Sequence, residues 1–287
     1  MTSRLLIDIQ SLLNRREISA LCTVVKTEGS TPLKTGAQML VRVENEKGVL
    51  VAGTIGGGAL EYSVLGQAAQ AIAAGESKLF QHRLTVDHKM CCGGTVHVFI
   101  EVIAPPPQCF IFGAGHVGKA LAQLLATLEF DVSLIEGRPN LLEESATRFI
   151  AAPPEIALQS LKWDGNTYAV IATHSHALDR ELLHQALAKP FQYLGMIGSK
   201  RKVLVTRKLF LERGWADDDD LDDIDMPIGV AIAAESPAEI AVSIAARMIE
   251  VKNRRGREQP RREKSLSNIH TLIPDLTHGF SSATTTL

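Results

Sequence analysis

Apolar residues recur along the chain in two arrangements, which lie on either side of a run of prolines. Ahead of the prolines, the pattern predicts helices at 5–13 and 60–74 and strands at 20–25, 38–43, 49–52, 79–84 and 96–103. Beyond them, it predicts strands at 109–112, 131–136, 168–173 and 193–197, alternating with helices at 117–128, at 178–188, from about 200 and from 236. We therefore predict an α/β fold: a smaller N-terminal α+β domain with an antiparallel sheet, then a domain with a mostly parallel sheet.

The prolines at 105–107 mark the clearest boundary, because consecutive prolines stiffen a linker and cannot form a central strand. The predicted parts are a domain at 1–104, a linker at 105–108, a domain at 109–252 and a tail at 253–287. The tail is basic and then rich in serine and threonine, which predicts disorder. Residues 26–36 and the acidic stretch 217–225 are predicted as loops.

Composition narrows the class of protein. The chain has 287 residues, a formal net charge of −2 and four cysteines. A nearly balanced charge is untypical of nucleic-acid binders, and no apolar run reaches the roughly 18 residues of a membrane span. The cysteines are too few for a disulfide scaffold of this size, so we expect reduced thiols and a cytoplasmic location.

Three glycines stand between a predicted strand and a predicted helix with the spacing G-x-G-x-x-G. Gly113 would allow a sharp turn, Gly115 a close approach of backbone to phosphate, and Gly118 tight packing of the helix on the sheet. In this context the motif predicts a Rossmann-like domain. The helix N-terminus, which starts at about His116, would face an anion.

The end of the next predicted strand carries an acid and a base. Glu136 occupies the position at which an acid usually holds a ribose hydroxyl in such folds, and Arg138 lies close by. The pair fits an adenosine-type site, although an acid at a strand end is common without one.

Two histidines and a basic stretch follow later strands of the same predicted sheet. His174 and His176, with Asp179 nearby, suit metal binding or proton transfer, and they equally suit a helix start. Gly198–Ser199 and the three cations at 200–202 leave the next strand. Ligands bind at the carboxyl ends of strands in open α/β sheets, so we expect these loops to meet there and to suit an anion.

The N-terminal domain has a second glycine-rich turn. The amides of Gly56, Gly57 and Gly58 would form a nest for an anion, or the three glycines would simply allow a tight turn. Glu61 would compete there with a phosphate, so a helix-capping role suits it equally well. An earlier loop offers the hydroxyl of Ser30 to an oxyanion.

Two adjacent cysteines precede the glycines Gly93 and Gly94. Their spacing does not match a structural zinc site. A loop thiol beside glycine amides can have a lowered pKa and act as a nucleophile or a soft-metal ligand, and we assign this role to Cys92, with a buried core thiol as the alternative. We expect the other cysteines to be buried core residues: Cys22, Cys91 and Cys109.

Taken in order, the motifs resemble those of a known family. The N-terminal ones are Gly-Ser-Thr-Pro at 29–32, Gly-Thr-Ile-Gly-Gly-Gly at 53–58 and Cys-Gly-Gly at 92–94. The later ones are Phe-Gly-Ala-Gly-His-Val-Gly at 112–118, Thr-His at 173–174, Gly-Met-Ile-Gly-Ser at 195–199, Pro-Ile-Gly at 227–229 and Ser-Pro-Ala-Glu at 236–239. Over about residues 10 to 250 this succession resembles the XdhC/CoxI family, the xanthine dehydrogenase accessory proteins.

The resemblance implies a cytosolic maturation factor without a turnover reaction of its own. Members of the family bind molybdenum cofactor (molybdopterin) and protect it while a cysteine desulfurase replaces an oxo ligand by sulfur. They then deliver the cofactor to apo xanthine dehydrogenase, and they are typically dimeric or larger. The important cysteine of the family corresponds to Cys92 here, which implies a contact with molybdenum.

Two functions of other classes also fit the residues. One is an NAD(P)-dependent oxidoreductase that uses His174 or His176 as acid and base. The other is a non-catalytic, nucleotide-sensing protein that binds AMP or NAD and has no need of Cys92.

Overall fold

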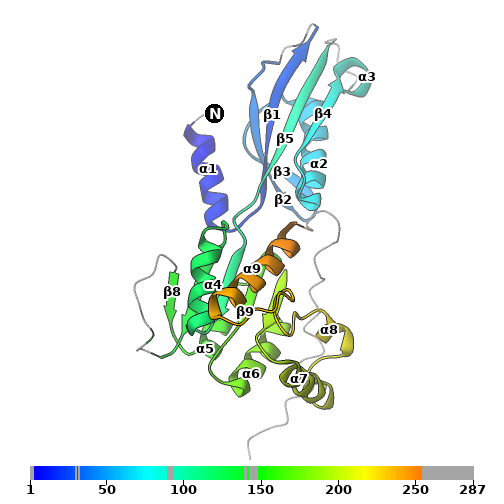
Figure 1. The fold of residues 1–287 in the computed structure, drawn as a ribbon. Helices are drawn as coiled ribbons and strands as arrows, with labels where there is room; N and C mark the ends of the chain where they lie inside the picture. Colours follow the sequence, from blue (N-terminus) through cyan, green and yellow to red (C-terminus); the bar gives the residue numbers. More distant parts are fainter. Residues whose placement is uncertain are drawn as a thin grey trace, which may run out of the picture. The chain divides into compact units, whose positions relative to one another are not determined.

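The chain forms two compact units (Figure 1), and the computed structural model describes residues 3–29, 31, 33–88, 94–138, 141 and 148–253. The first unit takes the described residues through Pro107, together with Glu129–Asp131 and those from Ile249. The second takes those in Gln108–Leu128 and Val132–Met248. Beyond Asn253, the predicted tail lies outside the described residues.

The first unit is built on a five-stranded antiparallel sheet in the order β3-β2-β1-β5-β4. Its elements are α1 (Ser3–Asn14), β1 (Ser19–Glu28), β2 (Gln38–Glu44), β3 (Lys47–Gly53), α2 (Gly58–Ala74), β4 (Lys78–Arg83), α3 (Leu84–His88) and β5 (Thr95–Ile103). Alternate residues of β1 face opposite sides of the sheet: Ala20 and Cys22 pack in the cluster of α2, and Leu21 in that of α1. The predicted antiparallel sheet is confirmed.

The second unit contains a five-stranded sheet in the order β10-β9-β6-β7-β8. The pairs β6–β9, β9–β10 and β7–β8 are parallel. Its elements are β6 (Gln108–Phe112), α4 (His116–Ala126), β7 (Asp131–Glu136), β8 (Arg148–Ala151), α5 (Pro154–Ser160), β9 (Thr167–Ile171), α6 (His176–Leu187), β10 (Tyr193–Met196), α7 (Lys200–Glu212), α8 (Asp218–Asp222) and α9 (Pro237–Asn253). The strand order reverses between β6 and β9, which is where ligands bind in such sheets. The predicted α/β fold class is confirmed.

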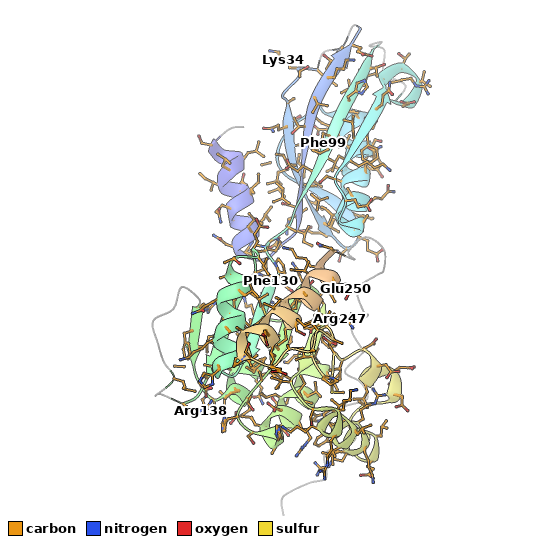
Figure 2. The ribbon with its side chains drawn as sticks, viewed as in Figure 1. Lys34, Phe99, Phe130, Arg138, Arg247 and Glu250 are labelled. Atoms are coloured by element: carbon orange, nitrogen blue, oxygen red, sulfur yellow. The ribbon has the colours of Figure 1, made fainter. Side chains whose placement is uncertain are left out.

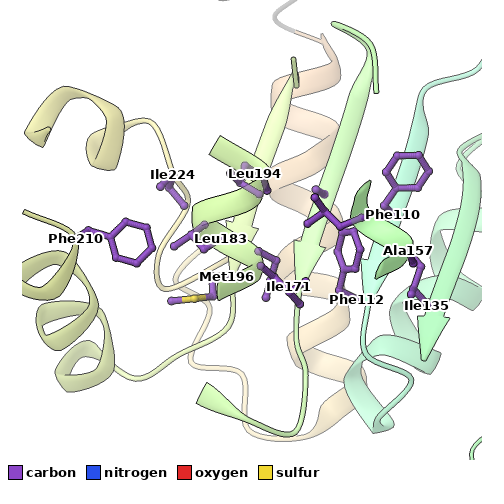
Figure 3. Close-up of a cluster of buried hydrophobic side chains, with 14 of the residues drawn as sticks. Phe110, Phe112, Ile135, Ala157, Ile171, Leu183, Leu194, Met196, Phe210 and Ile224 are labelled. Carbon is purple, nitrogen blue, oxygen red and sulfur yellow. The ribbon is translucent and has the colours of Figure 1, made fainter. Parts of the chain in front are cut away.

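Large apolar side chains from neighbouring strands and helices fill the core of the second unit. Phe112 of β6, Ile171 of β9 and Leu183 of α6 are fully buried in one cluster, together with Phe210 of α7 (Figure 3). Burying a side chain of this size contributes about 1.5–3 kcal/mol. The cluster fixes the strands, and so the loops that leave their carboxyl ends.

The predicted loop at 26–36 is wrong at its start. Its first three residues continue β1 after a shift of register at Val24, and they pair with β5 as far as Glu28 opposite Thr95. The strand is held by pairing with a distant segment, which the local sequence does not reveal. The predictions also omitted three short elements: α3, β8 and α5.

The acidic stretch 217–225, predicted as a loop, contains the helix α8. The side chain of Asp217 accepts a hydrogen bond from the amide of Asp220 at 2.8 Å, and the side chain of Asp220 accepts one from the amide of Asp217 at 3.3 Å. Leu221 is buried, and Arg207 pairs with two of the acids in the helix. Capping and ion pairing therefore order a segment whose composition alone suggested a solvated loop.

The predicted capping box at the start of α9 is confirmed. The amide of Ser236 donates to Glu239 Oε2 at 2.9 Å, and the amide of Glu239 donates to Ser236 Oγ at 3.3 Å. Farther along the helix, Arg247 (labelled in Figure 2) brings its Nε to 3.7 Å from a carboxylate oxygen of Asp225.

Candidate functional site

Packing requires two glycines of the motif that joins β6 to α4, one in the turn and one in the first turn of the helix. Gly113 has a φ of +118°, and a Cβ on it would lie 2.3 Å from the carbonyl oxygen of Ala172. A Cβ on Gly118 would lie 2.0 Å from the carbonyl oxygen of Gly113. The sharp turn and the close packing of α4 account for both residues.

Gly115 differs because nothing in the described structure requires a glycine at that position. Its φ of −71° is open to any residue, and a Cβ on it would meet no atom within 4 Å. The helix α4 begins directly after Gly115 without a side-chain cap, and His116 is exposed. Open space in front of uncapped helix amides suits an anion of phosphate size.

Glu136 is buried at the carboxyl end of β7, where neighbouring donors hold its carboxylate. The amide of Ala114 donates to Oε2 at 3.1 Å, and the guanidinium of Arg138 (Figure 2) donates to Oε1 at 3.0 Å and to Oε2 at 2.8 Å. Burial acts to raise the pKa of Glu136, but the hydrogen bonds from Arg138 and Ala114 outweigh it and lower the pKa to about 2. The group predicted to meet a ribose is therefore ionised and tied to the glycine-rich turn.

The loop after β9 is organised around Asp179, which is buried. Its Oδ1 accepts hydrogen bonds from the amide of Thr173 at 2.9 Å and from the hydroxyl of Thr173 at 2.7 Å. Its Oδ2 lies 3.4 Å from Nδ1 of His176. Both His174 and His176 are exposed, and among the described residues no three histidines, cysteines or carboxylates gather to hold a metal ion.

A pocket of about 310 Å³ lies between α6 and α7, where these helices begin. It is lined by His176, Arg180, Ser199, Arg201, Lys202 and Val205. The loops after β9 and β10 thus meet as predicted, through His176 and Ser199, whereas His174 and Gly198 are not among the lining residues. Arg180 was not predicted from the sequence, although its position four residues after His176 on one helix was a usable signal.

In the first unit, the side chain of Glu61 occupies the triple-glycine turn. Its Oε1 accepts hydrogen bonds from the amide of Ile55 at 3.0 Å, from the amide of Gly57 at 2.9 Å and from the hydroxyl of Thr54. Burial acts to raise the pKa of Glu61, but these hydrogen bonds lower it. The chain fills this nest with its own carboxylate, which favours the capping alternative. All three glycines have positive φ, as the turn alternative requires: Gly56, Gly57 and Gly58.

We predict that Glu61→Ala lowers the stability of the first unit at pH 7 by about 1 kcal/mol, because partly buried amides lose a charged acceptor. The pKa of Glu61 is lowered on folding, so its contribution is present above its ordinary pKa of 4.5 and is lost as the pH falls through the lowered pKa. The difference between wild type and variant should therefore shrink in acid.

Hydrogen exchange at the amides of Ile55 and Gly57 measures this effect within the first unit. Glu76→Ala is the matched control, because Glu76 is exposed near the other end of α2. Equal protection of these amides in wild type and in Glu61→Ala would show that the carboxylate does not stabilise the turn.

Three predicted motifs of the first unit come together next to β1 and β5. A Cβ on Gly29 would lie 3.3 Å from the Cα of Gly94, and a Cβ on Gly56 would lie 1.9 Å from Cδ2 of Leu33. The segment around Gly29 and Leu33 therefore touches both the Cys-Gly-Gly motif and the triple-glycine turn. Other predicted site residues lie outside the described residues: Ser30, Cys92 and Gly93.

The two described cysteines are buried core residues, as predicted. Burial raises the pKa of Cys22 to about 12 and raises that of Cys109 as well. Neither thiol is therefore suited to act as a nucleophile at neutral pH. Cys91, like Cys92, lies outside the described residues.

The fold and its loops define an α/β protein in which a Rossmann domain follows a glycine-rich α+β unit. Residues 109–248 match the family model described as "XdhC Rossmann domain", and residues 12–84 match the one described as "XdhC and CoxI family". The chain belongs to the XdhC and CoxI family, as the motifs indicated.

Two curated proteins are similar to the chain. Uncharacterized protein YqeB of Escherichia coli is 34% identical over 243 residues, which cover 82% of this chain and 43% of that protein. A probable xanthine dehydrogenase subunit of Bacillus subtilis is 31% identical over 166 residues, covering 56% of this chain and 47% of that protein. The chain thus spans about half the length of the curated relatives it matches.

One solved structure, described as a xanthine dehydrogenase from Bacillus halodurans, superposes with a TM-score of 0.48 at 21% identity. The match covers 86% of this chain and 95% of that one. Among the described residues, none of the helices combines the length and the apolar character needed to cross a membrane.

Proposed function

We propose that the chain is a maturation factor that holds molybdenum cofactor during sulfuration and inserts it into apo xanthine dehydrogenase. The proposed partners are a cysteine desulfurase, the recipient enzyme and a second copy of this chain in a homodimer. Membership of the XdhC and CoxI family supports a maturation role, and the name of the Bacillus subtilis relative agrees with a target of this type.

The observation that carries the proposal is the meeting of loops in the first unit. Gly29 and Gly94, far apart in sequence, come so close that a Cβ on Gly29 would crowd the Cα of Gly94, and the side chain of Leu33 lies against Gly56. Gly94 is two residues from Cys92 in the sequence, so the motif that carries the thiol has a described neighbour in the Gly-Ser-Thr-Pro segment at Gly29. Such loops let backbone amides approach an anion closely, with a soft donor beside them.

In this proposal Cys92 is a soft donor toward the metal, and the amides of Gly93 and Gly94 with the Ser30 hydroxyl bind oxygen atoms of the cargo. Separately, the open space beside Gly115 in the second unit suits a phosphate group of a ligand bound there. The molybdenum centre supplies the redox chemistry of the recipient enzyme. This chain binds, orients and shields it, and we assign no turnover reaction to the chain.

The test is the ligand that co-purifies with the full chain from a molybdenum-replete host. We expect molybdenum and pterin in equal amounts, measured by metal analysis and by fluorescence of the oxidised pterin. Titration with NADH in parallel addresses the oxidoreductase alternative. Tight NADH binding with no molybdenum or pterin would contradict the proposal and favour an NAD(P)-dependent oxidoreductase.

A second candidate, binding of an adenine nucleotide by the Rossmann domain, is favoured by the position of Glu136. Its carboxylate lies at the strand end where a ribose hydroxyl is bound in such folds, and it already contacts the amide of Ala114 in the glycine-rich turn. Titration with AMP tests this role, and Glu136→Ala should weaken AMP binding if it holds.

A further inference from the structure

The pocket between α6 and α7 is positively charged. Three of its six lining residues are cations, contributed by both helices, and none is a carboxylate. Within the described part of the chain, Arg180, Arg201 and Lys202 form no ion pair, whereas Lys208 on the same helix as the last two pairs with Glu212 at 3.7 Å. Clustered charges of one sign raise the local potential and attract a counter-ion of opposite charge.

The two helices add to this potential. α6 begins after Ser175 and α7 after Ser199, and each serine accepts a hydrogen bond from an amide of its own helix at 3.4 Å. Both helix N-termini follow strands of one parallel sheet, so their partial positive charges lie at the same sheet edge.

The histidine in the pocket is held in place by its neighbours. Nδ1 of His176 faces the buried Asp179, whose other oxygen is bound by Thr173. Nε2 is therefore the ring nitrogen left for a ligand. Ser199 adds a hydroxyl, and Val205 adds an apolar wall.

We propose that this pocket binds the phosphate group of a small phosphorylated molecule. The planar guanidiniums of Arg180 and Arg201 suit paired phosphate oxygens, and Lys202 adds a compact charge. A volume of about 310 Å³ accepts a phosphate with a small organic group. None of the lining residues belongs to the glycine-rich turn at 113–118, so this is a second anion position on the domain. The inference goes beyond the proposed function, which needs no such position.

The test is calorimetric titration of the full chain with inorganic phosphate and with pyrophosphate. We expect saturable binding that is weakened about tenfold or more in Arg201→Gln and in Lys202→Gln, since each loses a charge-assisted hydrogen bond. Both residues are exposed on α7, so neither substitution leaves a cavity in the hydrophobic core. Lys208→Gln is the matched control: it removes the same charge from the same helix outside the pocket.

Three results would overturn the proposal. The first is no saturable binding of either probe by the wild-type chain. The second is equal weakening in Lys208→Gln, which would reveal only a general effect of charge. The third is binding that survives both pocket variants but is lost in Gly115→Ala, which would place the anion at the glycine-rich turn. The probes contain neither molybdenum nor pterin, so failure here leaves the co-purification result unaffected.

Discussion

Gly118→Ala is expected to lower the free energy of unfolding of the second unit by about 3 kcal/mol, whereas Gly115→Ala should change it by less than about 1 kcal/mol. The added methyl group at Gly118 would overlap a backbone carbonyl oxygen at 2.0 Å, and neither α4 nor the turn can move without disturbing the sheet. At Gly115 the methyl group enters open space, and the backbone conformation suits alanine. The same change should therefore be strongly destabilising at one glycine of the motif and nearly neutral at the other.

Urea unfolding followed by tryptophan fluorescence isolates this effect. Both tryptophans of the chain lie in the second unit, Trp163 against Phe110 and Trp215 against Phe210, with ring centroids 5.3 Å apart in each pair. If Gly115→Ala proved as destabilising as Gly118→Ala, the conclusion that a methyl group at Gly115 enters open space would be wrong.

The ligand response should be the reverse of the stability response. Gly115→Ala places a methyl group where an anion would approach the amides of α4, so we expect its affinity for a phosphate-bearing ligand at this turn to fall about tenfold or more. AMP is the probe, titrated into the folded chain at pH 7. If a folded Gly115→Ala chain bound AMP as tightly as wild type, the turn would not be part of the AMP-binding site.

The sequence was sufficient for the glycine-rich motif and for the start of α9 because their signals are local. The strand-turn-helix context of Gly113 to Gly118 and the capping box from Ser236 to Glu239 both involve residues a few positions apart. Hydrophobic periodicity, glycine spacing and capping chemistry all indicated the same elements there, and the structure confirms them.

Features that depend on pairing between segments far apart in the chain could not be predicted from the sequence. The extension of β1 through Glu28 rests on its pairing with β5, and the approach of Gly29 to Gly94 follows from that pairing. The linear pattern indicated two separate loops where the fold places them side by side.

Charges were the hardest part of the site to predict. The sequence left two roles open for Glu61, and only the hydrogen bonds from Gly57 and Ile55 favour capping. Arg180 was missed because it lies one helical turn inside α6, where a cation is usually solvated. Its role depends on α7, which the sequence does not place next to it.

Cys92→Ala is expected to reduce the molybdenum retained by the full chain about tenfold or more, because losing even an outer-sphere partner typically weakens metal binding by that factor. The fold should be unaffected, since the position lies beyond the described end of α3 and is followed by two glycines. Unfolding followed by tryptophan fluorescence and hydrogen exchange in α2 should therefore match wild type. Cys91→Ala is the matched control, as it removes a neighbouring thiol and leaves the other in place.

The remaining cysteines make a second readout selective. Cys22 and Cys109 are buried, and burial raises the pKa of both thiols, so a thiol reagent at pH 7 should spare both in the folded chain and react at Cys92. Alkylation should be slowed by molybdenum cofactor in wild type and in Cys91→Ala, because the proposed binding mode would cover Cys92. If Cys92→Ala retained molybdenum at the wild-type level, or if cargo gave Cys92 no protection, the thiol would have no part in holding the metal. The glycine-rich loops alone would then have to account for binding.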